Sequence, residues 1–479
     1  MINSILSKEW IKLKNYIYSV LVIVFGVLMY FSYILGFEYG NIEPESMMWY
    51  MFVHLEHKPY EMFFYLFLVF ASFISIVQFV YERIRNRIKI LRHLPMSYDK
   101  IIWIHLAVGL FFVTIFWILS LVFVILIFAY YYPFPLIWMV VEDFCVYLFV
   151  SWLLYLTVSF LIIEANIIKK VSKSSLLIAL IIVVVRPDFS KDFTGYYIFY
   201  SPVLKEFIYQ KNYGEHQFDY KSKSNQTYTQ KEYESNLPFV YWKNLQIQGK
   251  LPITIDNTVF DVSDIKDARL SFEYKPEFLE TEPMKLYPFF NPKSTEGMIK
   301  FPEEALFFGY KKLELYDFDN KLLSEQTVEI NSLANSAWVS FPIQKVFGKP
   351  TNMKPFDLGY LFLDNENKLF HIKKEDDITT IKAVMLPKDV NVAYIHISEN
   401  KLKKTAGYMI DDKSRFYIMD WDFGFRILDI QGFDYQSMKA QLLSNSMYYT
   451  FRYNDSHIYN AVVFDKEFNF IDDISLEYK

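Results

Sequence analysis

The sequence predicts an α-helical polytopic membrane domain followed by a mostly-β soluble domain. Before about residue 186 the apolar residues form long runs, and after it they come in short alternating pieces rich in β-branched and aromatic residues. The net charge of −5 is only mildly negative, which argues against a general nucleic-acid binder. We therefore divide the chain into an interfacial helix (1–15), a membrane domain (16–187), a linker or surface lobe (188–236) and a β-rich domain (237–479).

The membrane domain contains about five predicted transmembrane helices. A helix needs about 20 residues to cross a hydrocarbon core about 30 Å thick. Four segments satisfy this requirement, namely residues 16–37, 61–81, 101–131 and 135–163. A fifth segment, 174–187, is short, but Arg186 at its end can extend its charge into the headgroup layer. We expect the fifth segment to span as well.

Basic residues predict the orientation of these helices. Lysines precede the first span, basic residues fill the second connection, and Lys169, Lys170 and Lys173 follow the fourth span. The connection 38–60 carries Lys58 as its only lysine, together with four glutamates. The positive-inside rule therefore predicts a cytoplasmic N-terminus and, with five spans, an extracytoplasmic domain after residue 187. If the fifth segment does not cross, that domain is cytoplasmic.

The N-terminus has an amphipathic pattern of its own. The apolar residues Ile2, Leu6, Trp10 and Leu13 recur at helical spacing, with Lys8 and Lys12 between them. We expect an interfacial helix over residues 1–15, with Leu6, Trp10 and Leu13 on the membrane, which turns into the first span near Asn15. The alternative is that this segment is simply the basic start of the first span.

The connection between the second and third spans, ERIRNRIKILRHLPMSYDKIIWIH (82–105), has two faces. Ile84, Ile88 and Leu91 form an apolar helical stripe, and Arg85, Lys89 and Arg92 form a basic stripe beside it. Pro95 ends the helix, after which Ser97 or Asp99 can cap the next one. This pattern suits a docking element for a cytoplasmic partner. It would also suit a helix lying on lipid with its basic stripe on anionic headgroups.

These two motifs, SKEWIKLK before the first span and YERIRNRIKILRHLPMSYDKIIWIHLAVG after the second, resemble the permease subunits of type-2 ABC transporters. In that family an elbow helix precedes the first span, and the connection between spans two and three docks on the ATPase. Glu82, Leu94, Pro95, Ser97 and Lys100 fall on the family's pattern positions. The resemblance covers about residues 1–185. Such permeases usually have six spans and end in the cytoplasm, and this chain departs from that pattern.

The permease resemblance implies a set of partners and a location. The implied docking residues are Ile84, Arg85, Ile88, Lys89, Leu91, Arg92, Leu94 and Pro95. The implied partners are membrane lipid, a separate ABC ATPase subunit, and as a further option a second copy of the chain or a second permease, with no nucleic acid. The implied location is the bacterial cytoplasmic (inner) membrane.

The soluble half is predicted to be β-rich after a polar linker or surface lobe. A weak repeat begins at Gly309, Gly359 and Gly407, each time a strand, an Asp-containing turn and a second strand, with a degenerate copy from Tyr448. The spacing of about 50 residues suits blades of four antiparallel strands, so a β-propeller is our first choice and a β-sandwich the alternative. The segment 434–444 reads as helical.

Two stretches of the soluble half, LPFVYWKNLQIQGKLPITI and FGKPTNMKPFDLGYLFLDNENKLFHIKK, resemble a bacterial family of membrane proteins. The C-terminal domain of that family has no assigned function. Its members look like accessory parts of ABC transport systems, which is all that the resemblance implies about activity.

The sequence contains no recognised catalytic motif. The stretch GKPT at Gly348 lacks the first glycine of a nucleotide-binding loop, and Pro350 stands where Ser or Thr is needed. No dinucleotide-binding, zinc-protease, dithiol or serine-hydrolase motif occurs either. Four scattered histidines, His216, His371, His396 and His457, lack metal-ligand spacing. Four polar residues in or beside the spans, His105, Glu142, Asp143 and Glu164, are interpreted as structural.

We therefore predict no enzyme and no catalytic, cofactor-binding or metal-binding residue. Energy for transport would come from a separate ATPase. The leading hypothesis is a permease-like membrane subunit of a type-2 ABC transport system with a large extracytoplasmic β domain. The alternative is a membrane-anchored interaction or assembly protein that does not transport. A membrane-bound hydrolase ranks third because no nucleophile–base set is visible.

Overall fold

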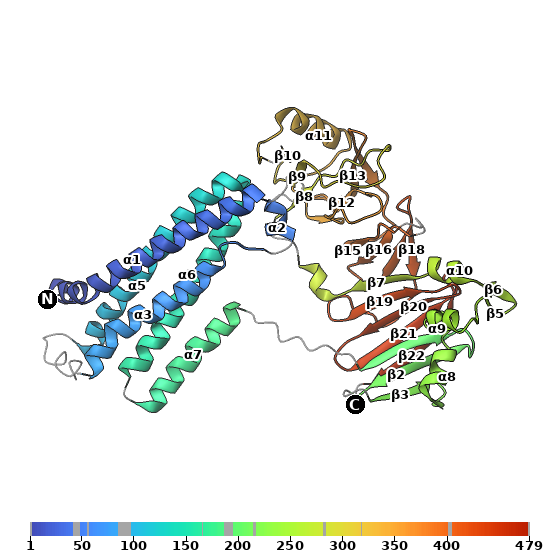
Figure 1. Ribbon diagram of the computed structural model, residues 1–479, viewed down its shortest axis with the longest axis horizontal. Helices are drawn as coiled ribbons and strands as arrows, with labels where there is room; N and C mark the ends of the chain where they lie inside the picture. The colour runs from blue at the N-terminus through green and yellow to red at the C-terminus, as the bar shows by residue number, and fades with distance from the viewer. Residues whose placement is uncertain are drawn as a thin grey trace.

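The computed structural model describes residues 2–41, 48–54, 57–84, 97–164, 166–185, 195–213, 217–280, 284–317, 319–400 and 405–477. Long helices make up one half of the molecule and β-sheets the other, as Figure 1 shows. The helices are α1 (Ile2–Asn41), α2 (Met48–His54), α3 (Met62–Ile84), α5 (Tyr98–Tyr131), the short η2 (Phe134–Leu136), α6 (Ile137–Ile163) and α7 (Ile167–Val185).

Four helices of the described part, α1, α3, α5 and α6 with η2, are long and apolar enough to cross a membrane. They correspond to the four long predicted spans. The predicted fifth span lies in α7, which begins earlier than expected, at Ile167, and includes Lys169 and Lys170. By length and composition α7 is not among the four, so its crossing stays a prediction.

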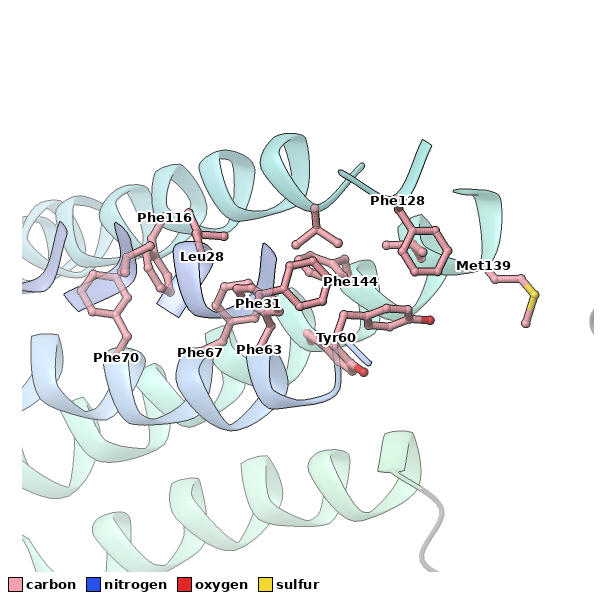
Figure 2. Close-up of a cluster of buried hydrophobic side chains, with 14 of the residues drawn as sticks. Leu28, Phe31, Tyr60, Phe63, Phe67, Phe70, Phe116, Phe128, Met139 and Phe144 are labelled. Carbon is pink, nitrogen blue, oxygen red and sulfur yellow. The ribbon is translucent and has the colours of Figure 1, made fainter. Parts of the chain in front are cut away.

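The core of the helical half is aromatic. Rings from α1, α3, α5 and α6 meet between the helices, as Figure 2 shows. Phe67 lies at the centre: its ring centroid is 5.2 Å from that of Phe116 and 5.6 Å from that of Phe144. Phe31 and Phe63 pack edge to face at 5.5 Å. Such pairs add about 0.5–1.5 kcal/mol beyond the burial of their area, so these four helices form one packed unit.

Helix α1 is a single continuous helix, and the turn predicted near Asn15 is wrong. Ile5, Glu9 and Leu13 are spaced four residues apart and all are buried. Their face therefore continues the core-facing stripe of the span instead of turning away from it. The physical reason is a set of polar contacts between these first turns and α3, described below.

The β half contains five antiparallel sheets and one two-stranded hairpin in the described residues. The first sheet is β1 (Tyr196–Ser201), β2 (Glu206–Asn212), β3 (Phe218–Ser222), β4 (Thr227–Tyr228), and the hairpin is β5 (Ile253–Ile255), β6 (Thr258–Phe260). The next three sheets are β8 (Leu286–Pro288), β9 (Glu304–Phe308), β10 (Leu313–Asp317); β11 (Lys345–Phe347), β12 (Tyr360–Leu363), β13 (Leu369–Glu375), β14 (Ile378–Val384); and β15 (Val392–Ile397), β16 (Gly407–Asp411), β17 (Phe416–Met419), β18 (Phe425–Leu428).

The last sheet has five strands in the order β22 (Phe470–Glu477), β21 (Ile458–Phe464), β20 (Tyr449–Asn454), β19 (Lys439–Ser444) and β7 (Leu270–Tyr274). Short helices fill the connections: α8 (Gln230–Ser235), α9 (Trp242–Ile247), α10 (Val262–Asp267), η3 (Pro276–Leu279) and α11 (Ser324–Ser336). Because β7 comes from much earlier in the chain, it ties an early part of the domain's sequence to its last four strands.

The sheets pack face to face in an open series. Sheet β8–β10 shares a core with sheet β11–β14, and the other face of sheet β11–β14 packs on sheet β15–β18. Sheet β15–β18 then packs on the five-stranded sheet, whose other face packs on sheet β1–β4. Residues of the sheet β8–β10 region, including Leu286 and Ala305, also belong to the core of the helical half. Within the described residues the series does not close into a ring. The sheets have the size of propeller blades, but no closed propeller forms.

The predicted repeat is present in three of its four copies. Gly359, Gly407 and Tyr448 each lead into the second strand of a four-strand meander, whereas Gly309 lies one strand later, in the turn between β9 and β10. A side chain at Gly359 or Gly407 would meet a neighbouring strand: its Cβ would lie 2.3 Å from the Ile372 carbonyl oxygen or 1.8 Å from that of His396. The glycines of the repeat therefore permit close strand approach.

The Asp-containing turns of the repeat share one geometry. Asp411 Oδ1 accepts hydrogen bonds from the backbone N–H groups of Lys413 (3.0 Å) and Arg415 (2.8 Å), and Ser414 has a positive φ of 62°. Asp364 makes the same pair of bonds two and four residues onward, at 2.8 and 2.9 Å. Asp420 and Asp465 repeat the pattern. The aspartate side chain accepts hydrogen bonds from backbone N–H groups that have no carbonyl partner in a tight hairpin loop.

One sequence prediction about the β half is wrong and another is incomplete. Residues 188–236 were expected to be a linker or surface lobe, and residues 196–228 of this segment form sheet β1–β4, because Ile198, Phe207 and their neighbours pack against β21 and β22. The segment 434–444 was expected to be helical, yet its second half is β19, paired on both sides with β7 and β20. In both cases distant strands, which local pattern does not reveal, decide the structure.

The helical and β halves are in contact. His54 Nε2 donates a hydrogen bond to the Leu286 carbonyl oxygen at 2.7 Å, and Asn320 Nδ2 donates to the Tyr131 carbonyl oxygen at 2.8 Å. The rings of Tyr50 and Phe301 pack at 4.9 Å. The β half therefore sits at the end of the bundle where α5 ends, next to α2.

We predict that Asp411→Ala lowers the free energy of unfolding of the β half by about 3 kcal/mol, because it leaves the N–H groups of the turn and the Arg415 side chain without their buried acceptor. Urea denaturation followed by pulse proteolysis measures this. The neighbouring exposed Asp412 is the control, and Asp412→Ala should change the value by less than about 0.5 kcal/mol. Equal effects of the two substitutions would show that the buried turn carboxylate is not what stabilises the hairpin.

Candidate functional site

Charged and polar side chains are buried between the helices at the end of the bundle far from the β half. This polar cluster comprises Glu9, Lys8 and Lys12 of α1, Gln78 and Glu82 of α3, His105 of α5 and Tyr155 of α6. Glu9 is 0% exposed, and Glu82 and His105 are each 1% exposed. Ionised groups so far from water require partners, because desolvating a lone charge costs several kcal/mol.

Lys12 is the centre of the cluster. Its Nζ lies 2.6 Å from Glu9 Oε1 and 3.4 Å from Glu82 Oε1, and it donates a hydrogen bond to the Gln78 carbonyl oxygen at 2.9 Å. Lys8 Nζ is a second cation for Glu82, at 2.9 Å. Two lysines therefore balance two glutamates, and the ion pairs join the first turns of α1 to the last turns of α3.

Gln78 extends the cluster to α5 and α6. Its Nε2 donates to Glu9 Oε2 at 2.9 Å and to the His105 carbonyl oxygen at 2.6 Å, and its Oε1 accepts from the Tyr155 hydroxyl at 2.7 Å. Gly109 of α5 leaves the space that this hydroxyl occupies, since a Cβ there would lie 2.0 Å from it. One amide thus connects four helices.

His105 faces a carboxylate with one ring nitrogen. Its Nδ1 lies 2.8 Å from the Ile101 carbonyl oxygen, which can only accept, so the hydrogen-bond network assigns the proton to Nδ1. Its Nε2 lies 3.5 Å from Glu9 Oε1. The same Glu9 oxygen pairs with Lys12, so the imidazole packs directly against the ion pairs that clamp α1 to α3.

The structure describes only the edges of the predicted docking element. Ile84 is the last residue of α3 and is 74% exposed. The other predicted docking residues, Arg85, Ile88, Lys89, Leu91, Arg92, Leu94 and Pro95, lie outside the described residues. Ser97 stands at the N-cap position of α5, but its side chain makes no capping hydrogen bond. Glu82, which belongs to the permease pattern, is in the polar cluster, two residues before α3 ends.

The three residues assigned to the interfacial helix separate into two environments. Leu13 is fully buried in the core of the bundle. Leu6 and Trp10 are 42% and 44% exposed, and the Trp10 ring stacks on Phe112 of α5 at 6.1 Å. Leu6 and Trp10 thus lie on the outer edge of the bundle, beside α5, where a lipid-facing role stays a prediction.

Sequence reasoning singled out Glu82 and His105 but missed Glu9, Gln78 and Tyr155. Glu9 had a usable signal, since it lies between Ile5 and Leu13 at four-residue spacing, on the face that is buried. The other polar residues considered in the spans are structural or exposed. Asp143 pairs with Lys58 at 2.8 Å and accepts a hydrogen bond from the Tyr60 hydroxyl at 2.5 Å. The Glu164 side chain accepts a hydrogen bond from the Asn166 backbone N–H, and Glu142 is exposed.

The β half offers no metal-ligand cluster in its described part. Across the described residues no group of three or more His, Cys, Asp and Glu side chains could hold a metal ion. His371 and His396 are separate core residues, and burial lowers the pKa of both, that of His396 to about 4. His457 is exposed, and His216 lies outside the described residues.

Fold and site together define a class: a membrane-type helical bundle with a buried polar cluster, joined to a domain of stacked antiparallel sheets. Residues 197–464 match a family model described as Domain of unknown function (DUF4857), which covers more than half of the chain. The chain belongs to this family, as the two resembling stretches of the soluble half indicate. No curated protein and no solved structure matches the chain. The match does not include the helical half, where the permease resemblance stays a prediction.

We predict that Lys12→Met destabilises the helical half by about 3–5 kcal/mol, because Glu9 then stays buried without its nearest cation. Denaturant titration in mild detergent measures this. Lys14→Met is the matched control, since Lys14 is a half-buried lysine of the same helix without an ion pair among the described residues. Adding Glu9→Gln to Lys12→Met should restore more than half of the loss. No rescue by the second substitution would mean that charge pairing is not the origin of the effect.

Proposed function

We propose that this chain is the permease-like membrane subunit of a type-2 ABC transport system in the bacterial cytoplasmic membrane, energised by a separate ATPase. The observation that carries the proposal is the polar cluster. The predicted docking element begins at the end of α3 and ends at the start of α5, and the polar cluster joins both of these points to α1. A force applied to residues 85–96 would reach both flanking helices and α1 together.

The cluster supplies the rigidity that such coupling requires. Glu82 lies two residues before the end of α3 and is held by Lys8 and Lys12, while His105 lies one to two turns into α5 and is held through Gln78. Both helices flanking the docking element are therefore anchored within about two turns of it. The apolar residues Ile84, Ile88 and Leu91 would contribute contact area to the ATPase, about 1.5–3 kcal/mol for each side chain fully buried. Arg85, Lys89 and Arg92 would set orientation and association rate.

The contact between the two halves supports an extracytoplasmic β domain. The β half touches α2 and the end of α5, which is the opposite end of the bundle from the polar cluster. If the basic end is cytoplasmic, the β domain is outside, and the chain must cross once more after α6. Helix α7 has 19 residues, about 28 Å of helix, which is close to the thickness of a hydrocarbon core.

The alternative is a membrane-anchored interaction or assembly protein that does not transport. The dense aromatic packing between α1, α3, α5 and α6 favours this alternative, because Phe31, Phe67, Phe116 and Phe144 fill the middle of the bundle. In the leading proposal the transport path would therefore form with a second copy of the chain or with a second permease. In neither case does the chain itself catalyse a reaction.

The topology can be tested with reporters. A reporter active only in the cytoplasm should be silent when fused after Lys479 and active when inserted after Arg92, because the positive-inside rule places these points on opposite sides. A reporter active only outside should give the reverse result. Strong cytoplasmic activity of the Lys479 fusion would mean that α7 does not cross the membrane.

Docking can be tested by substitution. The double variant Ile88→Asp with Leu91→Asp should reduce the amount of co-purified ATPase at least about tenfold, since two apolar contacts of the proposed interface are lost. Ile88→Leu with Leu91→Ile is the matched control and should leave recovery unchanged. Ser7→Asp adds a carboxylate at the same end of the bundle, on an exposed position of α1, and should also have no effect. Full ATPase recovery with the double Asp variant, correctly inserted in the membrane, would leave this connection as a topological signal only.

A further inference from the structure

A cavity of about 450 Å³ lies between sheet β1–β4, the five-stranded sheet and the turn before α9. Its apolar wall includes Phe199 of β1, Leu443 of β19 and, from the turn before α9, Phe239. Its polar wall is formed by Arg452 of β20 with Gln441 and Ser271. Cavities of this size, mostly apolar with a few convergent polar groups, are typical of small-molecule sites.

Arg452 is a buried cation without a carboxylate partner. The residue is 7% exposed. Its Nη1 donates to the Ile198 carbonyl oxygen at 3.1 Å, and its Nη2 donates to Gln441 Oε1. The guanidinium lies over the Phe199 ring, 5.0 Å from its centroid. Nε has no hydrogen-bond partner, and among the described residues no Asp or Glu forms an ion pair with the side chain.

This arrangement leaves a positive charge to be neutralised. The partners of Arg452 are a carbonyl, an amide and an aromatic face, all of them formally uncharged. A buried guanidinium without a counter-ion is unfavourable, whereas a guanidinium paired in fork geometry with a carboxylate or phosphate forms one of the strongest contacts available to a protein. Arg269, which is exposed, lines the same cavity and adds a second positive charge.

We propose that this cavity binds a small organic anion, a carboxylate or phosphate ester with an apolar body. The anionic group would pair with Arg452, with Gln441 and Ser271 as further polar contacts, and the body would pack on Phe199 and Phe239. Gln441 is already placed for this, since its Nε2 donates to Ser271 Oγ at 3.1 Å while its oxygen orients the guanidinium. The site belongs to the β domain alone and does not depend on the proposed ATPase partner.

The test uses the full chain purified in mild detergent and three probes of matched size: phenyl phosphate, phenylacetate and the neutral benzyl alcohol. Isothermal titration should give at least one of the two anions a dissociation constant of about 1 mM or lower, and benzyl alcohol at least tenfold weaker binding. Arg452→Met should weaken binding of that anion about 10- to 100-fold. Arg426→Met is the matched control, because Arg426 does not line the cavity.

A second variant keeps the proposal testable if Arg452→Met does not fold. Gln441→Glu retains the acceptor for Arg452 and adds the missing negative charge, so it should raise the melting temperature of the unliganded chain and abolish anion binding. These opposite effects distinguish a ligand site from a purely structural arginine. Absence of binding for both anions, or anion binding unchanged in Gln441→Glu, would overturn the proposal.

Discussion

Two carboxylates buried between helices, Glu9 and Glu82, set the main constraint on the helical half, and Lys12 meets both of them. Lys12 Nζ lies 2.6 Å from one and 3.4 Å from the other, and it offsets the cost of burying carboxylates away from water. Holding them there requires the first turns of α1 to lie against α3, so α1 continues straight through the position where a turn was expected. The registry of α1 against α3, and through Gln78 against α5 and α6, follows from this arrangement.

The other end of the bundle is fixed by different chemistry. Asp143, paired with Lys58 and Tyr60, holds the start of α3 to α6, and aromatic rings fill the space between the two polar ends. Helix α1 extends from the polar cluster towards the end that carries the β half, and its 40 residues correspond to about 60 Å. Such a helix is long enough to reach from the polar cluster to the end of the bundle where α2 contacts Leu286 and Phe301.

Features that depend only on residues close together in the sequence could be predicted from the sequence. The four long spans follow from hydrophobic runs, and the Asp turns follow from the short side chain that accepts nearby N–H groups, as at Asp411. Distant partners decided the rest. Glu9 and Gln78 are 69 residues apart, and β7 pairs with β19 about 170 residues later, so neither contact has a signature in a short window. The open series of sheets was missed for the same reason: repeat spacing predicts the size of a sheet and not whether the last sheet meets the first.

Charge balance separates the two buried polar regions of this protein. The cluster in the bundle has two lysines for two glutamates, so its ion pairs are complete within the chain and its role in the ground state is to clamp helices. Arg452 is buried to a similar degree, but its partners supply only uncharged oxygens and a ring face. A balanced cluster would lose stability if an anion entered it, since one of its pairs would have to break. An unbalanced cation beside a cavity gains a counter-ion from the same event. An entering anion would thus destabilise the cluster in the bundle and stabilise Arg452. This difference fits a clamping role for the helical half and the proposed ligand recognition for the β half.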